Sequence, residues 1–508
     1  MSVDTNNPNG DAGHLDADAD DATYTSTGTG PTMSSASEAG DRGNYEKVAA
    51  FLARCGLRAS AVAAAHDFAG ARFPGYEVAP APFQGYCSYT LLILPPTPGG
   101  RRRDSGVAAD DGSSNGAGGG DSSSNGEGSG GSGKGLPVGV ERGGNLLVQF
   151  RPRRHGINVG ICAEARGVFG GGTVPAVEDL GVLTGLETAD AGREDDGELC
   201  AYALERVGGV SLTQFRGLSA ALGMDSRACR RRVVADLAVV FADSWRGRRD
   251  GRDIVKGKVG GSLRWRLEVL AKGLPREFRG VVTRGMGELE EVEGLLPWVV
   301  THGDLVPDNV LVHPPCEDGD GAKGWNGRRR REMRERAGGL VGLIDWAEAE
   351  WLPFGVGMYG LEELLGEDVP AEDDSPESGT SNATTTTTTS GAGVTRFEYY
   401  PEANALRNLF WDEVGRVVGD EEVIRRARLA QVLGVLLWRG IAFDDGALGR
   451  AVDAEKDWWD LQRLRVWLFG EGGLGLEGGR GEEEEGQRGK GRWLRRVWRL
   501  MGRCFTAF

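Results

Sequence analysis

The chain has 508 residues, which is enough for two lobes or domains with a sizeable core. Its net charge of −16 argues against a general nucleic-acid-binding protein. The seven cysteines are scattered and contain no CxxC pair, which is typical of a reducing compartment and predicts neither a disulfide framework nor a zinc site.

The N-terminus is acidic and has no apolar core, so it resembles neither a secretory signal nor a basic transit peptide. No run approaches the roughly 18 apolar residues of a membrane span. We therefore expect a cytoplasmic protein without a transmembrane segment.

The 83 glycines gather in low-complexity segments that cannot bury enough apolar surface to offset their ordering entropy. We expect an acidic disordered tail at 1–42, disordered insertions at 95–143, 316–338 and 367–394, and an acidic, Gly-rich linker at 471–491. The basic run in 316–338 could contact an anionic substrate or a partner, but its Gly-rich flanks favour a solvated loop.

The first folded stretch mixes short strands with helices. The apolar patterns predict helices from Tyr45 to Leu57, from Ala61 to Phe68 and from Ile157 to Gly170, and strands within 84–94, 145–150, 174–183 and 202–207. The long insertion between the 84–94 and 145–150 strands adds only modest loop-closure entropy, so these two strands can still pair.

The second stretch is mainly helical. Apolar residues recur at helical spacing in segments near 229–245, 267–274, 286–296, 431–442 and 457–469. The tryptophans of the last segment are assigned to packing. A basic amphipathic helix at 492–508 is expected to dock on a protein, with peripheral membrane contact or packing against its own domain as alternatives.

The segment 301–354 carries the most specific pattern. His302, Asp304 and Asn309 form H-x-D-x-x-x-x-N, and Asp345 follows a further apolar run. Phosphoryl transfer from a nucleotide uses one carboxylate to orient the attacking hydroxyl, and an amide and a second carboxylate to hold magnesium. Taken singly, His302 is more typical of a structural histidine, and Asp345 could cap a helix.

The HGD and IDW sequences resemble the aminoglycoside phosphotransferase and choline kinase branch of the protein-kinase-like superfamily, and the tail WAEAEWLPFGVGMYGLEELLG resembles its fungal members. The resemblance covers about 45–470. It implies a two-lobed, protein-kinase-like α+β fold with a small β-rich N-lobe at 45–206 and a mainly helical C-lobe at 207–470.

The resemblance also implies roles for single residues. Asp304 would be the catalytic base, His302 a brace for its loop, and Asn309 and Asp345 ligands of Mg²⁺, with ATP as the phosphate donor. Backbone groups from Glu205 to Val207 would hydrogen-bond adenine at the hinge between the lobes.

The expected phosphate contacts depart from the kinase pattern. Gly85 would cover the phosphates, although an ordinary hairpin explains its segment equally well. Gln149 occupies the position of the kinase lysine, so either a nearby arginine replaces that cation or nucleotide binding is weakened. Glu164 would pair with Arg151, unless Glu164 is a surface residue and the arginines that follow Gln149 only solvate the strand exit.

These patterns predict Mg²⁺-dependent transfer of the ATP γ-phosphate to a hydroxyl of an unidentified small molecule. Glu348 and Glu350 would suit a cationic acceptor, although surface solvation explains them better. Gln149 and the single loop glycine favour the alternative of a catalytically weak or inactive kinase-like scaffold. A protein kinase is disfavoured because no DFG and no APE-bounded activation segment follow Asp345.

Overall fold

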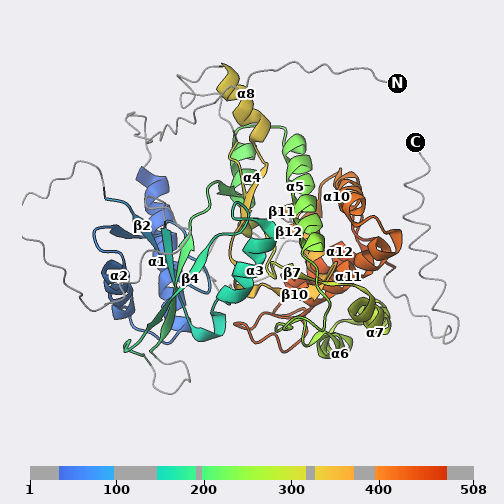
Figure 1. Ribbon diagram of the computed structural model, residues 1–508, viewed down its shortest axis with the longest axis horizontal. Coiled ribbons are helices and arrows are strands. Elements are labelled where there is room, and N and C mark those ends of the chain that lie inside the picture. Colours follow the sequence, from blue (N-terminus) through green and yellow to red (C-terminus); the bar gives the residue numbers. More distant parts are fainter. Residues whose placement is uncertain (1–33, 97–145, 190–196, 316–326, 371–394, 478–508) are drawn as a thin grey trace, which may run out of the picture.

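The computed structural model describes residues 34–96, 146–189, 197–315, 327–370 and 395–477 (Figure 1). An antiparallel sheet with its helices forms the N-terminal part, and the C-terminal part is mainly helical. The mixed α+β class predicted from the sequence is therefore confirmed.

The N-terminal sheet has five strands in the order β1-β2-β3-β5-β4, and all its neighbouring pairs are antiparallel. Its strands are β1 (Glu77–Pro80), β2 (Tyr89–Leu94), β3 (Leu146–Arg151), β4 (Val177–Leu183) and β5 (Leu199–Glu205). Strands β2 and β3 pair directly although the 97–145 segment separates them, as the sequence predicted.

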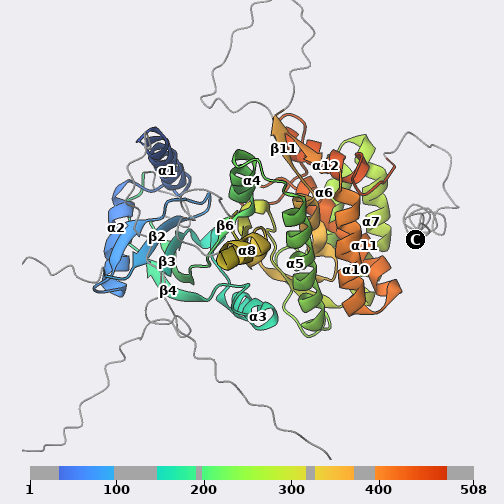
Figure 2. The same ribbon diagram turned by 90° about the horizontal axis from the view of Figure 1, so that it is seen from above.

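The two faces of this sheet belong to different hydrophobic cores. Along β5, Ala201 and Ala203 point to one core, and Tyr202 and Leu204 point to the other, because successive side chains of a strand alternate. The first core also holds apolar residues of α1 (Ser34–Arg54) and α2 (Ser60–Arg72). Figure 2 shows these helices on the side of the sheet away from the helical part.

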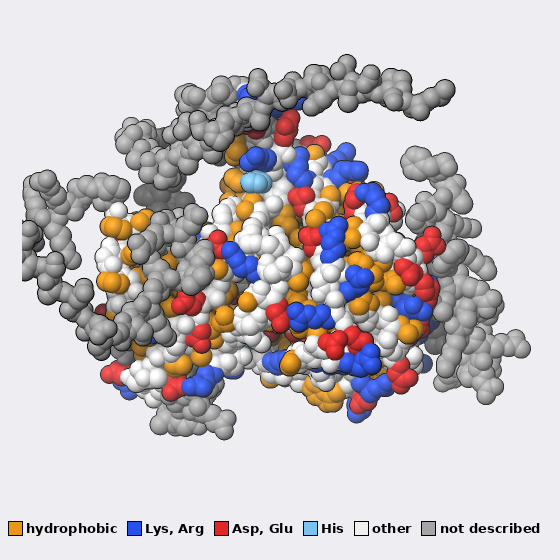
Figure 3. Space-filling model, viewed as in Figure 1, with side chains coloured by type: hydrophobic (Ala, Val, Ile, Leu, Met, Phe, Trp, Pro, Cys, Tyr) orange, Lys and Arg blue, Asp and Glu red, His pale blue; other side chains and the backbone are white. Residues whose placement is uncertain are grey.

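The second core joins α3 (Val159–Phe169) to the C-terminal helices. Those helices are α4 (Leu212–Ala221), α5 (Arg227–Arg246), α6 (Leu263–Gly273), α7 (Arg276–Leu295), α9 (Gly360–Leu364), α10 (Ala403–Val418), α11 (Glu421–Gly440) and α12 (Trp458–Phe469). On the face shown in Figure 3, acidic and basic side chains are interspersed over this helical part.

Short strands carry the segment with the phosphotransfer pattern. β7 (Trp298–Thr301) pairs with β10 (Glu350–Pro353), while β8 (Val310–Val312) pairs with β6 (Val210–Ser211) and β9 (Leu340–Leu343). β7 and β8 are buried throughout, as their apolar runs predicted, whereas only the second half of β9, the third run, is buried. β10 is buried as well, so these strands form a firm base for the loops between them.

Three elements differ from the sequence expectation. Helix α1 begins inside the predicted tail, α8 (Gly327–Arg336) occupies part of the 316–338 insertion, and β11 (Gly366–Pro370) pairs with β12 (Thr395–Tyr399) at the edges of the 367–394 insertion. Within α8, Arg328 and Arg331 pair with Glu332 and Glu335 at i,i+4 spacing, which stabilises a helix.

The other predicted segments of low complexity lie largely outside the described residues. These are most of the 1–42 tail, nearly all of 95–143, the 371–394 portion of the third insertion and most of the 471–491 linker. The predicted basic helix at 492–508 lies wholly outside the described residues. None of the described helices combines the length and the apolar composition that crossing a bilayer requires.

Candidate active site

His302 ties the loop after β7 to the end of β9. Its Nε2 donates to the carbonyl oxygen of Ile344 at 2.7 Å, and its Nδ1 accepts from the Asp304 backbone N–H at 3.2 Å. These two bonds require a neutral ring with its proton on Nε2. Burial lowers the pKa of His302 to about 4, so the ring keeps this form at neutral pH. Its geometry is that of a brace.

The glycine of HGD is required by a close backbone approach. Gly303 has φ +79°, and a Cβ on it would lie 1.9 Å from the carbonyl oxygen of Glu348. Any side chain would therefore clash with backbone and would also adopt a left-handed conformation. The small residue lets the Asp304 loop lie directly against the segment that follows Asp345.

Asn309 connects Asp304 to the same strand end. Its Nδ2 donates to the backbone oxygen and to Oδ2 of Asp304, both at 2.9 Å, and its own carbonyl oxygen accepts from Ile344 N–H at 3.0 Å. The side-chain nitrogen is thereby used within the protein, and Oδ1 is the side-chain atom that could hold a metal. Burial, and then the charge of Asp345, raise the pKa of Asp304 to about 7.

Asp345 turns its carboxylate toward the N-terminal sheet. The residue has φ 62° and ψ 64° and precedes the short 3-10 helix Trp346–Glu348, which is the position that the capping alternative required. Its Oδ1 lies 2.7 Å from Nη2 of Arg151. Burial raises the pKa of Asp345, but the Arg151 guanidinium, together with smaller contributions from His302 and the Ala347 N–H, lowers it below its usual value, so the carboxylate is ionised.

Arg151, two residues after Gln149, is a buried cation that contacts Asp345. It is the last residue of β3, its side chain is only 3% exposed, and its Nε donates to Oε1 of Gln149 at 3.1 Å. Residues 149 and 151 share one face of the strand, so the glutamine orients the guanidinium. The structure thus places an arginine beside Asp345, and whether this arginine replaces the kinase lysine or nucleotide binding is weakened stays a prediction.

The two arginines after Arg151 remain at the strand exit. Arg153 pairs with Glu198 at 2.9 Å, and Arg154 pairs with Asp445 at 3.0 Å. The interpretation that these arginines only solvate the exit is therefore wrong for Arg151. Arg153, whose side chain is 58% exposed, fits that interpretation.

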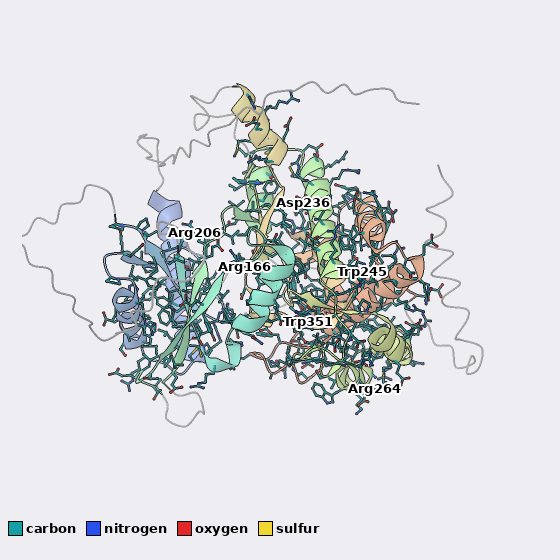
Figure 4. The ribbon with its side chains drawn as sticks, in the orientation of Figure 1. Arg166, Arg206, Asp236, Trp245, Arg264 and Trp351 are labelled. Atoms are coloured by element: carbon teal, nitrogen blue, oxygen red, sulfur yellow. The ribbon has the colours of Figure 1, made fainter. Side chains whose placement is uncertain are left out.

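Glu164 does not pair with Arg151, which corrects the sequence expectation. Its Oε2 accepts from Trp351 Nε1 at 2.9 Å, and its Oε1 lies 3.5 Å from Nη1 of Arg249. Figure 4 shows Trp351 beside α3, on the side of the C-terminal part. The guanidinium of Arg151 is already paired with Asp345, so Glu164 instead fastens α3 to β10 and to the loop before α6.

Gly85 lies in the loop between β1 and β2, which passes near the Arg151–Asp345 pair. The side chain of Gln84 pins this loop by donating to Ala81 O and Thr90 O, at 3.1 and 2.9 Å. The Cys87 thiol interacts with the charges of Arg151 and Asp345, and burial raises its pKa to about 11. Gly85 itself is exposed.

Glu205 and Val207 lie where β5 leaves the sheet. The backbone N–H of Glu205 donates to Ala176 O at 2.9 Å, and its carboxylate accepts from Ala176 N–H and from Arg166. Val207 lies against Gly342 of β9. The backbone N–H of Glu205 is therefore already engaged in the protein.

Glu350 is a buried residue whose carboxylate accepts from backbone N–H groups, so the surface solvation expected for it is wrong. It is 8% exposed and accepts from the backbone N–H groups of Val259 and Gly260, at 2.9 and 2.7 Å. The suggestion that Glu350 attracts a cationic acceptor is therefore wrong. Glu348 is exposed, and its charge contributes to the raised pKa of Asp304.

Tyr359 is a site residue that the sequence did not reveal. Its buried hydroxyl accepts from the Leu305 backbone N–H at 2.9 Å and so fixes the loop one residue after Asp304. Tyr359 follows Asp345 by 14 positions, within the tail that carries the resemblance, but nothing in that tail indicates a contact with Leu305, and only the folded chain brings the two segments together.

The residues present suit a magnesium ion that is shared with a nucleotide. Asn309 Oδ1 and the second oxygen of Asp345 are hard oxygen ligands, and Mg²⁺ commonly takes one or two protein ligands and completes its shell with phosphates and water. In the described ranges, no three His, Cys, Asp or Glu side chains cluster into a complete metal site. A nucleotide-dependent site fits this donor set, and a structural metal centre does not.

No family model and no curated protein match the sequence. Solved structures do show a likeness. An aminoglycoside phosphotransferase mutant with ADP and hygromycin B is 11% identical with a TM-score of 0.35, covering 79% of this chain and 96% of its own. A putative aminoglycoside phosphotransferase from Ralstonia eutropha is 11% identical with a TM-score of 0.37, covering 80% and 97%.

A microcompartment-associated aminopropanol kinase is 12% identical with a TM-score of 0.35, and the likeness covers 79% of this chain and 94% of that one. In fold, this chain is thus similar, at low identity, to the solved structures of aminoglycoside phosphotransferases and of an aminopropanol kinase.

Proposed function

We propose that this protein transfers the γ-phosphate of ATP to a hydroxyl of a small molecule, with Mg²⁺ as cofactor. The observation that carries the proposal is the convergence of Asp304, Asn309, Asp345 and Arg151, which come from three separate segments and are linked by the contacts of 2.7–3.0 Å described above. This donor set contains one carboxylate for the acceptor hydroxyl, two ligands for a metal and one fixed cation.

In this proposal Asp304 accepts the proton of the attacking hydroxyl. Asn309 already holds one carboxylate oxygen of Asp304, so the other can face the acceptor. The pKa of about 7 places Asp304 near the operating range of a general base. His302, Gly303 and Tyr359 hold the loop, which matters because positioning dominates this reaction.

Arg151 binds the phosphate oxygens and places them over Asp345. Asn309 and Asp345 would hold the metal, which when bound neutralises the charge that develops on the phosphates. The loop around Gly85 covers the phosphates, and backbone groups at 206–207 hydrogen-bond the adenine. The acceptor is a hydroxyl-bearing small molecule whose identity we leave to screening.

The second candidate is a kinase-like scaffold with little activity. The ion pair between Arg151 and Asp345, at 2.7 Å, favours the scaffold, because Arg151 occupies one oxygen of the Asp345 carboxylate that would hold the metal. Binding of Mg·ATP separates the two candidates. The phosphotransferase predicts that Mg·ATP raises the Tm and that Mg²⁺ is needed for the effect, while the scaffold predicts no shift.

The decisive measurement is ADP release in the presence of a library of hydroxyl-bearing metabolites. Asp304→Asn should lower kcat by about 10²–10⁴-fold, because it removes the proton acceptor. Asp308→Asn is the matched control, since this exposed carboxylate lies in the same loop. Equal turnover by Asp304→Asn and wild type under every condition would exclude Asp304 as the base.

A further inference from the structure

A loop of the C-terminal part, residues 443–448, reaches across to the N-terminal sheet. It lies between α11 and α12, and its base is closed by the Ile441–Ala451 bridge. Arg450 fixes the base further by paired hydrogen bonds to the carboxylates of Asp444 and Asp457. The loop is therefore a braced projection.

The tip of the 443–448 loop contacts two separate segments of the N-terminal part. Asp445 pairs with Arg154 at 3.0 Å and with Nε2 of His155 at 3.2 Å. The Phe443 ring stacks on His155 with centroids 6.2 Å apart, and it meets the Tyr86 ring edge-on at 6.1 Å. One loop thus touches the turn after β3 and the loop between β1 and β2.

Both of these segments lead directly to the proposed phosphate site. The carbonyl oxygen of His155 accepts from Nη1 of Arg151 at 3.5 Å. Tyr86 stands between Gly85 and Cys87, and Arg54 lies over its ring at 3.7 Å and donates to its carbonyl. A shift at the loop tip would therefore be transmitted to the phosphate-covering loop and to the fixed cation.

The backbone of the loop is held in costly conformations. Asp445 and Leu448 have φ values of 50° and 47°, and Gly446 approaches His155 so closely that a Cβ would lie 3.0 Å from Cε1. Left-handed non-glycine residues persist only where surrounding contacts determine them. Here those contacts are the ones that cross between the two parts, together with Lys258 donating to the Gly446 carbonyl at 2.5 Å.

We propose that Asp445 and Phe443 are positioning residues that hold the N-terminal sheet closed over the site, so that Arg151 and the Gly85 loop stay in register with Asp345. The nucleotide aspect of this proposal rests on the proposed function. The closure itself does not, because it concerns contacts between two parts of the same chain.

The first test measures closure without any ligand, by hydrogen exchange of the full-length protein. Asp445→Asn removes the charge and keeps a residue that tolerates a left-handed backbone, and Phe443→Ala removes the ring. Each should speed exchange about threefold to tenfold at 84–88 and 152–156. Glu455→Gln, an exposed carboxylate just beyond the same loop, is the control. Unchanged exchange in both variants would overturn the proposal.

The second test measures the effect on the site. Both variants should raise the KM for Mg·ATP about threefold to tenfold and leave kcat within about twofold, because they alter placement and not chemistry. In a double-mutant cycle, Asp445→Asn and Arg154→Gln should be non-additive. A fall in kcat with KM unchanged would overturn the positioning role.

The two proposals fail in different ways. If wild type does not bind Mg·ATP but the exchange of 84–88 and 152–156 rises in the variants, the closure stands and the phosphotransferase is wrong. If wild type binds and turns over Mg·ATP and the variants match it in exchange and KM, the phosphotransferase stands and the positioning role is wrong.

Discussion

The two hydrophobic cores of this protein pack on opposite faces of the N-terminal sheet and contain different helices. The smaller core packs α1 and α2 against one face of the sheet, whereas the larger core packs α3 and the C-terminal helices against the other. A division of the chain at residue 206 would place α3 with the sheet. Packing places α3 with the helices, and the Glu164 contacts with Trp351 and Arg249 reinforce that placement.

This difference suggests how the site could open. If α3 stays with the helical part, the sheet with α1 and α2 is the body that can move. Arg151 belongs to the sheet and Asp345 to the helical part, so their ion pair joins the two parts. The predictions below test this division, beginning with the largest expected effect.

Phe150→Ala should destabilise the smaller core alone. Phe150 is fully buried there, and truncating a buried phenylalanine costs about 3–5 kcal/mol. All 13 tryptophans lie at position 245 or beyond, so their emission reports on the C-terminal part. Far-UV circular dichroism should show a transition at lower denaturant concentration, while the tryptophan transition stays close to that of wild type.

The matched control is Phe278→Ala, which truncates a fully buried phenylalanine of the larger core. It should move the tryptophan transition to lower denaturant concentration. If Phe150→Ala moves that transition as far as Phe278→Ala does, the cores unfold as one cooperative unit and the proposed division is wrong.

Gly303→Ala should distort the site more than it affects either core. The added Cβ would meet the Glu348 carbonyl oxygen at 1.9 Å in a left-handed conformation, at a cost of about 3 kcal/mol. We expect a lower Tm and loss of ADP release. Gly294→Ala, at a glycine near the end of α7 with open space around it, is the control and should leave both unchanged. A fully active Gly303→Ala would show that the Asp304 loop does not need this close approach.

Periodicity in the sequence was sufficient for most of the regular elements. The apolar runs at 298–300, 310–312 and 340–344 and the stripe in 229–245 correspond to β7, β8, β9 and α5. Helix α8 was missed because its composition matches that of a solvated loop, and only the spacing of its Arg–Glu pairs indicates a helix. The two cores could not be predicted, because they depend on which face of β5 each helix covers.

The site was predictable where it is local and not where it depends on long-range contacts. The spacing of His302, Asp304 and Asn309 lies within one loop, so their linkage follows from the sequence. The partners of Arg151 and Glu164 are 194 and 187 residues away in the chain. The resemblance implied a pair between Arg151 and Glu164, because contacts so distant in the chain leave no local pattern. In the folded chain Arg151 contacts Asp345, and Glu164 contacts Trp351.

Glu164→Ala tests whether α3 belongs to the helical part. It removes the acceptor of Trp351 Nε1 and the ion pair with Arg249, and should cost about 1–2 kcal/mol, seen as a lower midpoint of the tryptophan transition. The affinity for Mg·ATP should change less than about twofold, since Arg151 does not depend on this carboxylate. Glu164→Gln keeps an acceptor for Trp351 and isolates the ion pair. A tenfold loss of affinity would restore the kinase-like pairing of Glu164 with the phosphate-binding cation.

Glu288→Gln should change the unfolding free energy least among these variants, and its effect should depend on pH. Burial, and then the charge of Glu291, raise the pKa of Glu288 to about 7 from 4.5 in α7 of the larger core. A raised carboxyl pKa means that the folded state holds its proton over a range where the unfolded chain has lost it. The contribution of Glu288 to stability therefore falls as pH rises from about 4.5 and levels off above about 7. Glu288→Gln should raise the unfolding free energy at pH 8 by on the order of 1 kcal/mol and leave it unchanged at pH 4.

The tryptophan transition should show this gain in stability, because α7 packs in the core that tryptophan emission reports. A gain that is equal at both pH values, or confined to the circular dichroism of the sheet, would place the effect elsewhere.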